Sequence, residues 1–250
     1  MTAVLGGVLV VLPVIALVAR APWGRFGKVL GSEGARTALR LSFEVSLAAT
    51  ALSVLLGVPL AWVLARREFR GRSVLRAMVV LPIVLPPVVA GVGLLEALGR
   101  RGLVGGWLDR TWGIQLTFST AGAIVAATFV SMPLMILAAE SGFRGLDPRY
   151  EQAAGVLGAS SGYTLRRVVL PMVAPQLAAG AVLAWARALG EFGATITFAG
   201  NLQGRTQTVP LRVFEQLQTD RDGAVALSLV LVAISIAVLV ALRERIMGAR

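Results

Sequence analysis

Six long apolar blocks limit what this sequence can fold into: residues 3–19, 42–65, 77–98, 121–140, 171–199 and 223–242. A helix of about 20 mostly apolar residues crosses the roughly 30 Å hydrocarbon core of a bilayer. The chain is 56% hydrophobic and only 15% charged, whereas soluble domains carry about 25% charged residues. The polar stretches between the blocks are too short to fold independently. The sequence therefore predicts an all-α integral membrane protein that uses lipid as part of its solvent, with one transmembrane domain over residues 1–250.

The first block has two interpretations. Ala19-Arg20-Ala21 has the small-x-small pattern of a signal-peptide cleavage site. Such signals carry a basic segment before the apolar run, and this chain has none there. We therefore favour a retained membrane helix.

Composition excludes several kinds of chemistry. The chain has no cysteine and no histidine, which argues against disulfides, thiol chemistry and most zinc sites. We expect no catalytic residue, metal site or cofactor, and the sequence lacks a Walker-type phosphate loop, so any ATP must be bound by a partner subunit. The net charge of +11 lies mostly between the apolar blocks, where it orients membrane helices, and this argues against nucleic acid. The basic residues are divided almost evenly between the two sides, so charge alone leaves the orientation open.

The loop between the fourth and fifth blocks has its own local signals. Asp147-Pro148 is a favourable helix start. The helix is expected to continue to Leu157, and Gly158 is expected to end it. A second helical stretch, 163–169, leads to Pro171. From spacing alone, an ordinary amphipathic helix at the membrane surface explains this loop equally well.

The same loop resembles the signature of ABC importer permeases: Glu-Ala-Ala, three residues, Gly, nine residues, then Ile-x-Leu-Pro. Gln152 stands in the Glu position and Glu151 precedes it. The resemblance implies a six-helix type I ABC importer permease fold. Residues 147–170 would then be a cytoplasmic coupling-helix loop that docks on an ATPase subunit, with both chain termini cytoplasmic. The Gln puts in doubt any ion pair that the usual Glu makes with the ATPase. The implied ATPase-coupling residues are Glu151, Gln152, Ala153, Ala154, Gly158, Leu170 and Pro171.

Three further segments resemble the molybdate and sulfate permeases: Pro82-Ile-Val-Leu-Pro-Pro87, Trp185 to Asn201 and Thr208-Val-Pro-Leu. This resemblance implies a homodimer in a bacterial or archaeal inner membrane, with cytoplasmic ABC ATPase subunits and an extracytoplasmic oxyanion-binding protein. It favours molybdate as cargo, with tungstate as a companion. Sulfate or thiosulfate is the alternative, although those systems usually pair two different permease chains. A secondary transporter driven by an ion gradient leaves the coupling-type loop unexplained, and an intramembrane enzyme lacks a catalytic constellation.

The fifth block is interrupted by charge. Arg187 and Glu191 lie four residues apart, so they share a helical face and can pair. They should face the protein interior or a water-filled path, because an unpaired charge in lipid is costly. We favour a structural ion pair that fixes helix packing, and the alternative is that this segment is part of a gate at the dimer interface. The Pro-rich third block is expected to kink and either pack or line the path. The gate candidates are Arg187, Gly190, Glu191, Gly193, Thr195, Thr197, Pro86 and Pro87. We expect Glu140, near the end of its block, to be solvated by the membrane interface.

Overall fold

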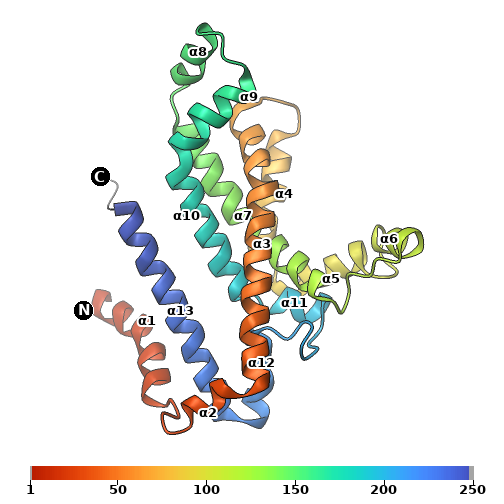
Figure 1. Cartoon of the computed structure of the whole chain (residues 1–250), viewed down its shortest axis with the longest axis vertical. Coiled ribbons are helices and arrows are strands. Elements are labelled where there is room, and N and C mark those ends of the chain that lie inside the picture. Colours follow the sequence, from red (N-terminus) through yellow and green to blue (C-terminus); the bar gives the residue numbers. More distant parts are fainter. Residues whose placement is uncertain (1, 248–250) are drawn as a thin grey trace.

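The computed structural model describes residues 2–247, and it is helical throughout its regular structure. Three long helices form the central bundle: α3 (Glu33–Arg66), α7 (Thr120–Gly145) and α10 (Leu170–Leu189). Each packs against the other two (Figure 1). Two outer helices, α1 (Thr2–Ala19) and α13 (Arg221–Met247), contact one another, and α13 also packs on α10.

Within residues 2–247, four helical stretches are long and apolar enough to cross a membrane: α3, α7, 161–189 and the first part of α13. The apolar stretches Val4–Ala19 of α1 and Pro87–Leu98, which is helix α5, are shorter. The predicted blocks at 3–19, 42–65, 121–140 and 223–242 therefore each lie within one helix.

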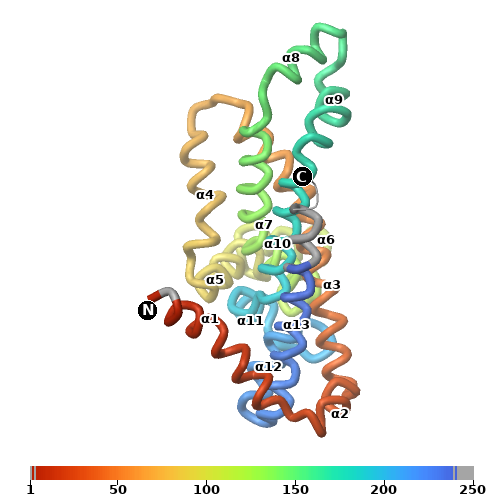
Figure 2. Tube along the Cα trace, turned by 90° about the vertical axis from the view of Figure 1, so that its left-hand side faces the viewer, coloured from red at the N-terminus to blue at the C-terminus, as the bar shows by residue number. Residues whose placement is uncertain are grey.

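The expected single span at 77–98 is wrong, because this segment forms two helices. Helix α4 (Arg72–Val84) runs alongside α7, and α5 turns away from it (Figure 2). Leu85 and Pro86 between them are extended, with ψ of 135° and 134°. A proline pushes the preceding residue out of the helical region, and two successive prolines remove two N–H donors. The Pro-rich centre thus breaks the helix completely, whereas the sequence predicted only a kink.

The expected span at 171–199 is also divided. Helix α10 ends at Leu189, and a short helix, α11 (Gly193–Phe198), follows after a non-helical link. Before α10, a short helix α9 (Ser161–Thr164) continues into a π-helix, η1 (Leu165–Val169). The interruption that the charges indicated is therefore present, whereas the π-helix was not expected.

Small residues let the central helices approach closely. Helix α3 buries Ala38, Ala49, Gly57 and Ala61 along its length. The hydroxyl of Ser53 lies 3.3 Å from that of Ser131 on α7. Close contact between small side chains and hydrogen bonds across helices are typical of membrane bundles, where lipid removes the hydrophobic drive for helix association.

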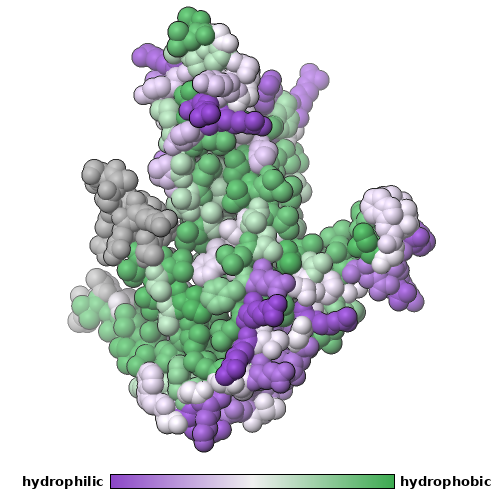
Figure 3. All heavy atoms as spheres, viewed as in Figure 1, coloured by the Kyte–Doolittle hydropathy of each residue, from purple (hydrophilic) through white to green (hydrophobic). Residues whose placement is uncertain are grey.

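The polar residues gather toward the ends of the molecule. Helices α8 (Arg149–Val156) and α9 form one end, whereas α2 (Phe26–Gly31) and α12 (Val209–Thr219) lie at the other. The surface between them is mostly hydrophobic on the face that Figure 3 shows. Helix α6 (Gly105–Trp112) projects to one side, beyond α5.

Candidate functional site

The loop that joins α7 to α10 carries α8 away from the bundle (Figure 1). The Asp147 carboxylate accepts the N–H of Arg149 at 2.9 Å, which supplies the expected helix start. Gly158 has a φ of 81°, a left-handed conformation that favours glycine, and it follows the end of the helix as expected. Val156 and Leu157 at the tip are each almost 90% exposed. A helix with no buried residue and an apolar tip is suited to dock on another protein.

The predicted coupling residues divide between two places. Gln152 and Ala153 are exposed on α8, Ala154 is half-buried, and Gly158 lies at the tip. Glu151 points inward instead, and its Oε1 lies 2.6 Å from Nη2 of Arg66, the last residue of α3. Leu170 and Pro171 lie at the base of the loop, in the first turn of α10.

The π-helix explains the place of Leu170 and Pro171. Pro171 has no N–H, and its ring would clash with the carbonyl four residues earlier in a regular α-helix. In the π-helix, the N–H of Leu170 bonds the carbonyl of Leu165, five residues back. Leu170 itself packs against the main hydrophobic core. These two residues therefore shape the junction between the loop and the bundle and lie away from the exposed tip of α8.

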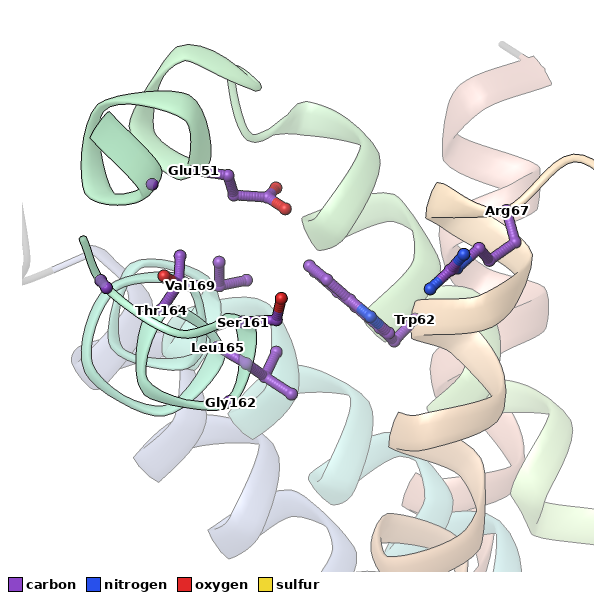
Figure 4. Close-up of a pocket in the computed structure, with 10 residues that line it drawn as sticks. Trp62, Arg67, Glu151, Ser161, Gly162, Thr164, Leu165 and Val169 are labelled. Carbon is purple, nitrogen blue, oxygen red and sulfur yellow. The ribbon is translucent and has the colours of Figure 1, made fainter. Parts of the chain in front are cut away.

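A cavity of about 430 Å³ lies between α8, the α9–η1 segment and the end of α3. Its walls include Trp62, Arg67, Glu151, Ser161 and Leu165. Figure 4 shows Glu151 projecting into this space, with the Trp62 ring across it. Helix α8 is thus separated from α3 by a space that side chains only partly fill.

The second candidate region is the junction between α10 and α11. Nη1 of Arg187 lies 2.7 Å from Oε2 of Glu191, and the other carboxylate oxygen accepts the N–H of Ala194 at 2.7 Å. The Glu191 side chain is 2% exposed and that of Arg187 is 35% exposed. The carboxylate therefore both neutralises Arg187 and caps the start of α11, as a buried charge requires.

Helix α11 packs closely on α5. A Cβ at Gly193 would lie 2.4 Å from Cβ of Pro87, and one at Gly91 would lie 2.5 Å from Cβ of Thr197. The hydroxyl of Thr197 donates to the carbonyl of Gly193 at 2.9 Å. The structure thus brings together Pro87, Gly193 and Thr197.

The remaining gate candidates are more dispersed. Thr195 is buried on α11, whereas Gly190 is exposed at the end of α10. Pro86 is also exposed, at the corner between α4 and α5. Neither Gly190 nor Pro86 has a positive φ.

Sequence reasoning missed a set of arginine contacts at the α8 end of the bundle. Arg66 pairs with Glu151, and Arg72 donates twice to the carbonyl of Leu64, at 3.0 and 2.6 Å. Arg76 pairs with Glu140. The expectation that Glu140 is solvated is wrong: it is 5% exposed and also lies 3.1 Å from Nε of Arg144. The four-residue spacing of Glu140 and Arg144 was the one signal available. Arg72 and Leu64 are eight residues apart, on opposite sides of a turn, and the other two contacts join distant segments.

Comparison with known proteins identifies the chain's family. Residues 53–249 match the model described as "Binding-protein-dependent transport system inner membrane component". The molybdenum transport system permease protein ModB of Mycobacterium tuberculosis is 47% identical over 97% of this chain and 92% of its own length. The Escherichia coli K12 ModB is 42% identical over 81% of this chain and 88% of its own. The sulfate transport system permease protein CysT of the same strain is 34% identical, over 92% of this chain and 84% of its own.

Two solved structures share the fold. A bacterial ABC transporter involved in alginate import superposes with a TM-score of 0.72 at 19% identity, covering 96% of this chain and 91% of the other. The inward-facing MetNI methionine ABC transporter gives 0.62 at 16% identity, covering 88% of this chain and 99% of the other. This chain is therefore a multi-pass membrane protein with the type I ABC importer permease fold, and it belongs to the family of binding-protein-dependent transport system inner membrane components.

Proposed function

We propose that this chain is the membrane-spanning subunit of an ATP-driven importer that moves molybdate, and tungstate with it, into the cytoplasm. The observation that carries the proposal is 47% identity to a molybdenum permease over 97% of this chain. The second candidate is a sulfate or thiosulfate permease, which the 34% identity to CysT supports less strongly.

The geometry suggests where the partners bind. The exposed tip of α8, with Val156 and Leu157, suits an apolar groove on a cytoplasmic ATPase subunit. In this arrangement the α8 end faces the cytoplasm, and the end with α2 and α12 meets an extracytoplasmic oxyanion-binding protein. Helix α13 runs from the α12 end toward the α8 end (Figure 1), which agrees with a cytoplasmic C-terminus; we place the N-terminus there too. Two copies of this chain would form one path in the inner membrane of a bacterium or archaeon.

Within such a dimer, the α5–α11 contact is the proposed gate. Its short segments end at a non-helical link and at a proline corner, so each can move without bending a long helix. Arg187 is neutralised by Glu191, so the segment does not present an unpaired cation that would trap a divalent anion. Weak binding favours release, which conduction requires. ATP hydrolysis takes place on the partner, and this chain contributes the path.

The test is transport by the purified complex in proteoliposomes. The permease, its ATPase and its binding protein are reconstituted, and ATP-dependent uptake of labelled molybdate is measured with excess sulfate or tungstate. We expect tungstate to compete and sulfate to leave uptake unchanged. Competition by sulfate, together with a second permease chain in the purified complex, would instead support the sulfate alternative. Uptake without the ATPase would contradict the ABC importer.

A further inference from the structure

We propose that Arg66 is a positioning residue for transport: its ion pair with Glu151 fixes the coupling helix α8 to the end of α3 and so transmits the movement of α8 to the membrane bundle. This inference rests on the proposed function and assigns a second role to the loop. Glu151 faces Arg66, on the inner side of α8, so the tip is left to bind the ATPase.

Helix α8 has little else to attach it to α3. It buries none of its residues and packs on α9 and η1, within its own loop. The cavity of about 430 Å³ separates it from the α3 end. Among the side chains that the structure describes, which leave out those of residues 3, 239 and 241–247, the contact of Glu151 with Arg66 is the one ion pair or side-chain hydrogen bond that joins α8 to a helix outside the loop.

Arg66 is held in place independently of Glu151. Its Nη2 donates to the carbonyl of Leu146 at 3.2 Å, at the start of the loop. Its guanidinium carbon also lies 5.6 Å from the centre of the Trp62 ring on the preceding turn of α3, within the range of a cation–π contact. The guanidinium therefore projects from α3 in a fixed position, and Glu151 meets it.

The environment gives the pair more strength than a surface contact has. The Arg66 and Glu151 side chains are 18% and 27% exposed. A partly buried pair is weakly screened by salt. The contact is an ion pair by distance, because Nη2 of Arg66 lies 2.6 Å from Oε1 of Glu151, and among the described residues that oxygen accepts no hydrogen bond. A force on the tip of α8 would therefore reach α3 through this contact as well as through the chain.

The same geometry accounts for the neutral residue in the signature. Because Glu151 is occupied by Arg66, it does not replace the Glu that this chain lacks at position 152. Gln152 is exposed and uncharged. Docking of the ATPase on this chain is then mainly apolar, through the tip, while the Glu151 carboxylate serves the attachment to α3.

The experiment compares transport per ATP in variants of the reconstituted complex. Arg66→Met and Glu151→Gln remove either partner, and Arg67→Met is the matched control. Arg67 is the next residue, lines the same cavity, is exposed and makes no ion pair with any side chain that the structure describes. We expect the first two to lower molybdate uptake per ATP hydrolysed by about fivefold, the lower end of typical coupling between sites. The control should match the wild type. Unchanged uptake per ATP in both Arg66→Met and Glu151→Gln would overturn the proposal.

A covalent replacement separates attachment from folding. The chain has no cysteine, so an Arg66→Cys/Glu151→Cys variant can be linked by a bismaleimide before the ATPase is added. We expect the unlinked variant to be uncoupled and the linked one to regain at least about half of the wild-type uptake per ATP. Failure of the link to restore coupling would overturn the proposal.

Retention of the ATPase on the purified variants checks that docking is intact.

The wild-type complex is measured first. Absence of ATP-driven molybdate uptake there would contradict the proposed function, and labelled sulfate would then replace molybdate in the same comparison. The ion pair is thus tested whichever anion the complex carries.

Discussion

Two arginine–glutamate pairs lie in regions with different constraints. The Arg187–Glu191 pair lies within one segment at the α10–α11 junction, where the carboxylate is almost fully buried. The Arg66–Glu151 pair joins two helices at the edge of the bundle, beside a cavity, and both of its side chains keep some contact with solvent. The first pair is fixed by its surroundings, whereas the second bridges elements that otherwise barely touch. Removing one partner of a buried pair strongly destabilises the local fold. Removing one partner of a partly exposed pair that bridges two helices costs less stability, so such a pair can transmit movement between the helices without being essential to the fold.

The largest expected effect is at the buried pair. Arg187→Met leaves the Glu191 carboxylate without its cation, and removing one partner of a buried pair costs about 3–5 kcal/mol. The free energy of unfolding in detergent micelles measures this loss. Arg187→Met/Glu191→Gln should lose less than Arg187→Met alone, because no unpaired charge remains.

Equal losses in the single and double variants would show that the unpaired Glu191 charge is not what destabilises Arg187→Met. Transport gives a separate result. If Arg187→Ala/Glu191→Ala retains wild-type ATP-driven uptake, the pair is structural and its place in the gate is wrong.

The next effect concerns the close contact of α5 with α11. Gly91→Ala places a Cβ 2.5 Å from Cβ of Thr197 and 3.0 Å from the carbonyl oxygen of Ala194. Such overpacking costs about 1–3 kcal/mol, measured again as unfolding free energy. The control is Gly93→Ala on the same helix, where the added Cβ meets nothing within 4 Å. If Gly93→Ala loses as much stability as Gly91→Ala, the loss comes from changing glycine to alanine within α5 and not from a clash with α11.

A smaller loss is expected at the bridging pair. Arg66→Met should lower the free energy of unfolding by about 1 kcal/mol, because the remaining Glu151 carboxylate is 27% exposed and can turn toward solvent. Its effect on transport per ATP should be the larger one. A loss of stability that matches Arg187→Met would remove the distinction between the two pairs.

The smallest effect is expected on the outer face of α8. Gln152→Glu introduces the charge that the family signature has at this position. Exposed substitutions usually change stability by less than about 0.5 kcal/mol, so the unfolding free energy should equal that of the wild type. A clear loss would show that Gln152 has a partner within the bundle, and the outer face of α8 would then not be free for docking.

The fold was predictable where the signal was local. Four apolar blocks lie within one helix each, and Asp147 and Gly158 bound α8 as their chemistry predicts. The two failures have local causes too. The pair Pro86-Pro87 removes two donors and breaks the span at 77–98, and the Glu191 carboxylate caps a new helix inside the span at 171–199. The prolines and the charged residues were both recognised in the sequence, but their effect on the helices was underestimated.

The candidate site was predictable only in part. Arg187 and Glu191 could be paired from their spacing because one helical turn brings them together. The pairing of Glu151 with Arg66 could not be predicted, because the two residues are far apart in the chain and no local pattern places their side chains together in space. The same holds for Glu140, which would remain solvated if α4 did not bring Arg76 onto α7.

From the sequence alone it could be predicted that this protein lies in a membrane, that it has six apolar blocks and that the loop after α7 forms a helix. Composition and short-range hydrogen bonding decide these three features. The tertiary structure decided which charges meet. Helix packing places Arg66, Arg72 and Arg76 against partners on α8, α3 and α7. One of these contacts, Arg66 with Glu151, joins α8 to the bundle, and no local pattern in the sequence brings its two residues together.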